Sequence, residues 1–329
     1  MQESTHSSRL ETLRHLQAGN GVDCVALVPG ANLRYFTGLA GHLSERPTIA
    51  FIPARGPLTV VLPELEAPAA RSQLPPDAQL FTYRDEEGHE HVFHQVSEDL
   101  ALSGKPIGVE YLAMRLLEMR RIEQAAPDCQ LLAVEPWLPK LRMKKDKGEV
   151  ARMQQAIAIA ERAMQHLLDR GAIRPGRTEL EIAADLRIEM LSEGGQGEAF
   201  SPIVVAGPNS ASPHASPSDR PLAEGDLVTI DWGTTNQGYR SDITRTFVLG
   251  SPTPEISKIY EAVLAANQAG RLAVTLAFQL RKWIELHAGP SVWPGTANTL
   301  STALATVWDW KPTSRHTSWR ATWIYLNRG

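Results

Sequence analysis

Apolar and polar residues alternate in two different ways along the first part of the chain. Residues 8–18 place Leu10, Leu13 and Leu16 on one side of a helix, and Gly19 follows as a stop signal. Short apolar runs bounded by turn residues predict strands between the helices. Because strands that alternate with helices are typical of an α/β domain, we expect one over residues 1–137. The predicted strands are 24–28, 48–53, 57–63 and 107–111, with a further helix at 114–124.

The pattern then changes to longer amphipathic helices, with strands between them. A capping pattern of Asp146 and Glu149 precedes apolar residues at helical spacing as far as Gly171. Paired helices with antiparallel strands are typical of an α+β domain, which we expect over residues 138–275. The other predicted elements are helices beginning at Thr178 and Pro254, a strand at 203–206 and two strands within 227–250.

Residues 227–250 predict a β-hairpin that carries two acidic side chains. Strand alternation puts Val228, Ile230 and Trp232 on an apolar face and Asp231 on the opposite one. With Asn236-Gln237 as a two-residue turn, Asp231 is expected directly across from Asp242. Like charges at a cross-strand pair are destabilising. The pair therefore indicates either a bound cation or a solvated hairpin with two surface carboxylates.

The literal residues of this hairpin favour the cation. Ile-Asp-Trp-Gly, followed by Gly-Tyr-Arg-Ser-Asp-Ile-Thr-Arg-Thr, closely resembles the metal-binding hairpin of the creatinase, aminopeptidase P and prolidase family, the "pita-bread" metallopeptidases. Residues 33–38 resemble the N-terminal domain of the same family. The resemblance implies an α/β N-terminal domain followed by an α+β pita-bread domain. It also implies that Asp231 and Asp242 bind two divalent metal ions, with manganese favoured and cobalt or zinc as alternatives.

The same resemblance implies an activity and a substrate. The family cleaves the peptide bond before proline in dipeptides or at peptide N-termini, so the implied partner is a proline-containing peptide. Its creatinase branch uses no metal, and the intact Asp231 and Asp242 argue against that branch. A homodimer is also expected. The remaining metal ligands of the family are one His in a Gly-His-Gly segment and two Glu further along.

A loop histidine is a further candidate. The strand 203–206 leads into a turn-rich loop, Gly-Pro-Asn-Ser-Ala-Ser-Pro, that ends at His214. A histidine in such a loop is more often a solvated surface residue than a catalytic one. The loop, however, resembles the Asn-Ser-Ala-x-Pro-His segment of the family. That resemblance implies that His214 lies by the metals and helps to bind substrate and the developing oxyanion.

Composition sets the limits of these interpretations. The formal charge of −4 over 329 residues gives no indication of a nucleic-acid or anionic-membrane partner. The two cysteines form no disulfide framework, and no signal peptide or membrane-spanning run is visible, so a cytoplasmic location is expected. Residues 276–329 differ from the rest, because they hold six of the eight Trp and only two acidic residues.

Codon arithmetic suggests why this segment differs. When each codon is read one base early, Trp308-Asp309 must give Gly, Asp309-Trp310 must give Leu and Trp310-Lys311 must give Glu. The neighbouring codons permit Gly-His-Gly-Leu-Gly-Leu-Glu-Thr-His-Glu, which matches the missing family segment. We therefore infer that residues 276–329 are out of frame after a one-base loss near Thr275, in the gene or in its sequencing. The competing interpretation is a genuine divergent segment.

The sequence therefore predicts a metal-dependent Xaa-Pro peptidase, of the dipeptidase or aminopeptidase type, with an incomplete pita-bread domain and impaired activity. The alternative is a non-catalytic remnant that binds a partner or dimerises.

Overall fold

The computed structural model describes residues 2–287 and 325–326. The chain divides into two compact units, with the boundary between Lys145 and Asp146. The first unit alternates strands and helices, and the second packs helices on an antiparallel sheet. The predicted fold class, α/β followed by α+β, is therefore confirmed.

A mixed six-stranded sheet forms the centre of the first unit, with the strand order β4-β3-β2-β1-β5-β6. The predicted strands 48–53 and 57–63 form a hairpin, since β2 and β3 pair antiparallel around the turn at Gly56. β1 joins this antiparallel pair to the parallel strands β5 and β6. The strands are β1 (Cys24–Leu27), β2 (Ile49–Pro53), β3 (Thr59–Pro63), β4 (Gln79–Tyr83), β5 (Pro106–Val109) and β6 (Gln130–Ala133).

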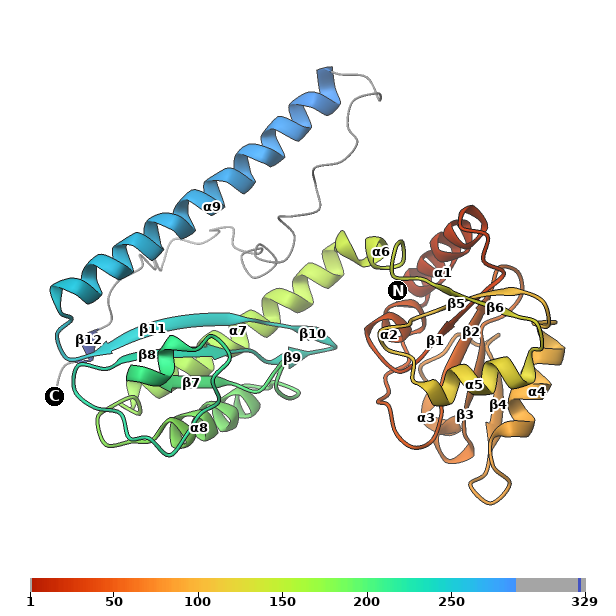
Figure 1. Ribbon diagram of the computed structural model, residues 1–329, viewed down its shortest axis with the longest axis horizontal. Helices are drawn as coiled ribbons and strands as arrows, with labels where there is room; N and C mark the ends of the chain where they lie inside the picture. The colour runs from red at the N-terminus through yellow and green to blue at the C-terminus, as the bar shows by residue number, and fades with distance from the viewer. Residues whose placement is uncertain (1, 288–324, 327–329) are drawn as a thin grey trace. The chain divides into compact units, whose positions relative to one another are not determined.

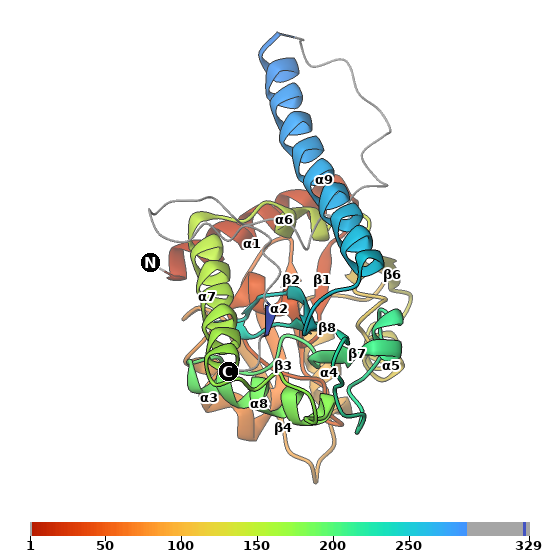
Figure 2. The same cartoon turned by 90° about the vertical axis from the view of Figure 1, so that its left-hand side faces the viewer.

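Helices cover both faces of this sheet, as Figures 1 and 2 show. Alternate residues of β1 explain the two layers, because Val25 and Leu27 pack with α1 and α2 while Cys24 and Ala26 pack with α4 and α5. All four of these side chains are buried. The helices are α1 (Gln2–Gly19), α2 (Ala31–Thr37), α3 (Ala67–Arg71), α4 (Glu90–Asp99), α5 (Leu116–Ala125) and α6 (Pro139–Met143).

The second unit begins with two helices packed side by side on one face of a sheet (Figures 1 and 2). The predicted capping pattern is present, since the Asp146 side chain accepts from the Glu149 N–H; the helix predicted to begin at Thr178 is capped in the same way, because the Thr178 side chain accepts from the Glu181 N–H. Trp232 donates its indole N–H to the Ala160 carbonyl, and this bond connects the sheet to α7. The elements are α7 (Lys147–Asp169), α8 (Glu179–Ser192), β7 (Ile203–Ala206), β8 (Leu227–Trp232), β11 (Ile243–Leu249) and β12 (Tyr325–Leu326), with the sheet order β12-β11-β8-β7.

The hairpin register differs from the predicted one. The short strands β9 (Thr235–Asn236) and β10 (Tyr239–Arg240) flank a turn at Gln237-Gly238, not at Asn236-Gln237. Both turn residues have positive φ, 48° and 82°, as a type I′ turn requires, and glycine suits the second position. This one-residue displacement puts Thr244 opposite Asp231 and corrects the predicted pairing of Asp231 with Asp242.

A long helix, α9 (Pro254–His287), follows the hairpin and passes residue 275 without a break. It begins at the predicted proline, where the Thr253 side chain accepts from the Ile256 N–H. Ile259, Val263 and Leu272 are exposed on it. Apart from the end of α9 and the two residues of β12, the segment 276–329 for which we infer a frame slip lies outside the described residues.

Candidate active site

The two acidic residues of the hairpin are placed by the pleat of β8 and β11. Neighbours of Asp231 on β8, Ile230 and Trp232, are buried against the helices, so Asp231 points to the other face of the sheet. Asp242 lies two residues before Thr244, the partner of Asp231. Asp231 and Asp242 are therefore diagonal neighbours on one face, a spacing within reach of side-chain interaction.

Gly233 makes this approach of the two strands possible. A Cβ atom at position 233 would lie 1.9 Å from the carbonyl oxygen of Ser241, far inside contact distance. The Ser241 hydroxyl also accepts a hydrogen bond from the Thr234 N–H, at 3.0 Å. Glycine is thus required at the third position of the Asp-Trp-Gly motif because the backbone next to Asp242 occupies the space of a side chain.

The electrostatics around Asp231 are unfavourable in the absence of a cation. Its Oδ1 atom is buried and has no hydrogen-bond partner. Burial raises the pKa of Asp231 above its ordinary value, and the charge of Asp242 raises it further, while Thr244 acts in the opposite direction. An unpaired buried acceptor beside a second carboxylate is a site where a positive charge would be stabilised.

The two carboxylates fit a divalent metal ion as two of its ligands, because hard and borderline ions prefer carboxylate oxygens. Asp231 and Asp242 supply oxygens on one face, and an unpaired oxygen is available for coordination. Within residues 6–274, whose side chains the structure describes, no group of three or more His, Cys, Asp or Glu is placed so that it could hold a metal ion. The described residues therefore supply part of a ligand set.

His214 lies on the exposed part of the loop that follows β7. In the described residues it does not join Asp231 and Asp242 in a cluster of three candidate ligands. The loop starts at Ala206, which pairs with Val228, three residues along β8 from Asp231. At the rise of a strand, about 10 Å separate the start of the loop from the carboxylate. The path of the loop from Ala206 to His214 therefore determines how far the imidazole lies from the carboxylates of Asp231 and Asp242.

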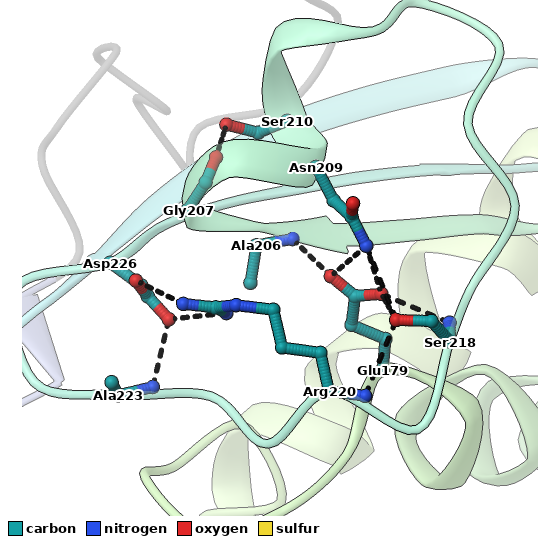
Figure 3. A network of polar contacts seen from close by, with 9 residues as sticks. All are labelled: Glu179, Ala206, Gly207, Asn209, Ser210, Ser218, Arg220, Ala223 and Asp226. Atoms are coloured by element: carbon teal, nitrogen blue, oxygen red, sulfur yellow. Dashed lines mark hydrogen bonds and ion pairs between the residues drawn. The ribbon is translucent and has the colours of Figure 1, made fainter.

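A buried glutamate at the start of α8 organises that loop, as Figure 3 shows. Glu179 is fully buried and accepts hydrogen bonds from the backbone N–H groups of Ala206, at 2.7 Å, and Ser218, at 3.0 Å. The Ser218 hydroxyl donates to it at 2.7 Å, and the Asn209 amide at 3.0 Å. The sequence pattern does not reveal this residue, because a glutamate in the first helical turn normally interacts with the helix end and stays exposed.

An ion pair next to this cluster fixes the return of the chain toward β8 (Figure 3). The guanidinium of Arg220 donates to both oxygens of Asp226, at 2.8 and 3.0 Å, and the Ala223 N–H adds a third bond at 2.8 Å. Burial acts to raise the pKa of Asp226, but these partners hold it below its ordinary value. Gly207 lies against the pair in a left-handed conformation, φ 53°, where a Cβ would meet Asp226 at 2.6 Å.

Comparisons with known proteins agree with this architecture. The family profile "Creatinase/Prolidase N-terminal domain" matches residues 9–144, and "Metallopeptidase family M24" matches residues 151–283. The probable dipeptidase PepE of Mycobacterium tuberculosis is 32% identical, over 82% of this chain and 70% of that protein. The Xaa-Pro dipeptidase of Pyrococcus furiosus is 30% identical, over 79% and 70%.

A solved structure shares the fold as well. The crystal structure of a recombinant prolidase from Thermococcus sibiricus superimposes with a TM-score of 0.75 at 26% identity, covering 80% of this chain and 71% of that one. The chain therefore belongs to the M24 metallopeptidases of the creatinase and prolidase type. Within that family its relatives include Xaa-Pro dipeptidases, so it is an enzyme of the Xaa-Pro dipeptidase class by descent.

The dipeptidases of this family depend on divalent metal ions, as the hairpin motif had indicated. In the part of the chain that the structure describes, none of the helices combines the length and the apolar character needed to cross a bilayer.

Proposed function

We propose that this protein derives from a peptidase that hydrolyses the bond before proline, and that Asp231 and Asp242 are its metal ligands. The observation that carries the proposal is the unpaired, buried Oδ1 of Asp231 beside a second carboxylate. Neither group gains from this arrangement unless a cation joins them. The match of the surrounding residues to M24 metallopeptidases supports a pair of divalent ions, with manganese favoured and cobalt or zinc as alternatives.

The chemistry follows from what each residue can do. Bound divalent ions supply an acidified water and polarise the scissile carbonyl group. Asp231 and Asp242 would hold the ions on the polar face of the hairpin. His214, on its loop, can donate a hydrogen bond to the oxygen of the substrate as negative charge develops there. The substrate is a proline-containing dipeptide or peptide, as the names of the relatives suggest. A homodimer in the cytoplasm remains a prediction.

We further propose that the chain with residues 276–329 as printed is impaired. Two carboxylates leave each ion mostly hydrated, so the ions are loosely held and the attacking water is poorly positioned. The printed chain lacks the His and the two Glu that complete the set in the family, and the alternative frame of residues 276–329 permits the Gly-His-Gly segment that carries the His. The chain matches about 70% of the length of its curated relatives.

A second candidate function is a non-catalytic protein that binds a partner or dimerises. It is favoured by one observation: within residues 6–274 the Asp231–Asp242 pair has no third acid or histidine beside it. Such a remnant would keep the two units and lose the metals.

The test is a paired assay at equal soluble concentration, with manganese added, on a dipeptide that ends in proline. One protein is the 329-residue chain, and the other has the frame restored near codon 275. We expect activity from the restored protein and a turnover at least a hundredfold lower from the printed chain. Equal turnover would show that the printed tail supplies its own ligands, and inactivity of both would favour the remnant.

A further inference from the structure

The loop that carries His214 begins and ends at a single carboxylate. Residues 207–217 leave β7 after Ala206 and return to α8 at Ser218. The Ala206 N–H donates to Oε1 of Glu179, and the Ser218 N–H and hydroxyl donate to Oε2. One buried side chain thus joins the two ends of the loop (Figure 3). A loop with joined ends has lost most of the entropy that would otherwise let it move as a whole.

Every group directed at Glu179 is a hydrogen-bond donor. Asn209, inside the loop, donates its amide to both oxygens of Glu179 and to the Ser218 hydroxyl, at 3.2 Å. The Ser218 hydroxyl can accept from Asn209 because its own hydrogen is directed at Glu179. An ionised carboxylate accepts this number of donors, and an amide in its place does not, since half of the amide is itself a donor.

The start of α8 adds backbone support to the same anchor. The first N–H groups of a helix have no partner within the helix. Here the Leu180 N–H donates to the Ser218 carbonyl at 3.1 Å, and the Glu179 N–H donates to the Arg220 carbonyl at 3.3 Å. Glu179 also lies at the positive end of the helix dipole, which stabilises its negative charge. The first turn of α8 therefore also holds the end of the loop in place through backbone hydrogen bonds.

The rest of the loop makes few other hydrogen bonds. Its remaining hydrogen bonds in the described residues are internal, from Ser210 to Gly207, from Ser212 to Asn209 and from Ala215 to Ser212. Prolines at 208, 213 and 217 restrict the backbone between these points. The direction of His214 thus depends on how the two ends are held.

We propose that Glu179 is the positioning residue for His214, fixing the ends of the loop so that the imidazole is presented to substrate bound beside Asp231 and Asp242. The inference rests on the proposed function and adds to it a residue that touches neither metal nor substrate. In this proposal the loop has to keep one conformation, whereas the hairpin has to bind a ligand.

The test compares two glutamates of the same kind in the full chain. Glu179→Gln replaces one of the two acceptor oxygens that join the loop ends with an NH₂ donor. Glu149→Gln is the matched control, because Glu149 is also buried in the first turn of a helix, where it accepts from the Asp146 N–H and the Tyr239 hydroxyl. Ser218→Ala is a milder second variant, in case Glu179→Gln does not fold. It deletes one bond to Glu179 and leaves the carboxylate in place.

Two readouts separate loop fixing from histidine positioning. Hydrogen exchange with mass spectrometry follows the peptides that cover 207–218. Spectra of ¹³C-labelled histidine, assigned with a His214→Gln variant, follow the broadening of the His214 signal by added Mn²⁺. We expect Glu179→Gln to speed exchange of the loop tenfold or more and to lower the Mn²⁺ broadening at least threefold, with Mn²⁺ affinity unchanged within about twofold. Ser218→Ala should shift both in the same direction by less, and Glu149→Gln should shift neither.

The possible failures are distinguishable. Loop exchange equal to that of the wild type in both Glu179→Gln and Ser218→Ala would show that Glu179 does not fix the loop. Faster exchange with unchanged broadening of His214 would show that the anchor does not position the histidine. An absence of Mn²⁺ binding by the wild-type protein would overturn the proposed metal site and, with it, the role given to His214.

Discussion

Two carboxyl groups of the second unit, Glu179 and Asp231, are in opposite situations. Glu179 is completely buried and accepts bonds from the backbone and side chains around it. Asp231 is half-buried, and one of its oxygens is buried without a partner while a second acid lies beside it. Both lie near β7, since Glu179 binds Ala206 at one end and Asp231 pairs with Ile203 at the other.

The difference distinguishes a carboxylate whose bonds are made within the fold from one that we propose binds a ligand. A buried polar group contributes to stability when its bonds are made, and it is destabilising when they are not. Glu179 meets the first condition within the protein. The bonds of Asp231 would be completed only by a bound cation. The carboxylate therefore lowers the stability of the metal-free protein, as groups kept for binding often do.

Neutralising the two groups should therefore change stability in opposite directions, and the larger effect belongs to Glu179. Glu179→Gln leaves buried N–H donors without acceptors, and we expect the free energy of unfolding to fall by about 2–3 kcal/mol. The measurement is urea unfolding of the full chain, read from hydrogen exchange of the α8 and β7 amides so that the second unit is followed alone. A loss no larger than that of an exposed substitution, about 0.5 kcal/mol, would remove the contrast.

Asp231→Asn should raise the stability of the metal-free protein. The substitution keeps the shape of the side chain and removes a like charge next to Asp242. The gain is expected to be below about 1 kcal/mol, because solvent screens a half-exposed group. The same exchange experiment in EDTA measures it. A clear loss of stability would mean that the carboxylate makes favourable contacts without a cation, as Glu179 does.

The smallest effect concerns pH, and its sign follows from the raised pKa of Asp231. A group whose pKa is higher in the folded state stabilises the fold most when it is protonated, and this contribution is lost as the pH rises through the folded pKa. Metal-free wild type and Asp231→Asn should therefore be nearly equal in stability below about pH 4, the ordinary range of aspartate. Their difference should grow on the way to neutral pH and then stay constant. A difference that is largest in acid would contradict the assignment.

The sequence predicted most of what depends on local rules. Asp146 and Thr178 are found as helix caps, and the alternation of Val228, Ile230 and Trp232 gave the buried face of β8. The hairpin turn was misplaced by one residue, because Asn236 and Gly238 both favour turns and the choice depends on a positive φ at Gln237. The prediction that Asp231 and Asp242 share one face is nevertheless correct. The observed register differs from the predicted one by a displacement along the strand, which leaves Asp242 on the same side of the sheet.

The parts that were missed depend on tertiary contacts. Glu179 has the sequence signature of an ordinary first-turn acid, and its burial results from a loop that returns from 39 residues away in the chain, at Ser218. Likewise, the resemblance to the family pointed to His214 but gave no indication of which contacts hold its loop. Motifs pointed to the residues that we propose perform the chemistry, whereas the contacts of Glu179 with the loop are visible only in three dimensions.

The most direct test of the central claim is a count of bound Mn²⁺ by electron paramagnetic resonance on the full 329-residue chain. We compare wild type, Asp231→Asn with Asp242→Asn, and Glu179→Gln, each titrated with Mn²⁺ at neutral pH. We expect weak binding by the wild type, a loss of at least tenfold in affinity in the double aspartate variant, and affinity within about twofold of wild type in Glu179→Gln. Equal binding by the wild type and the double aspartate variant would contradict the assignment of Asp231 and Asp242 as the metal ligands.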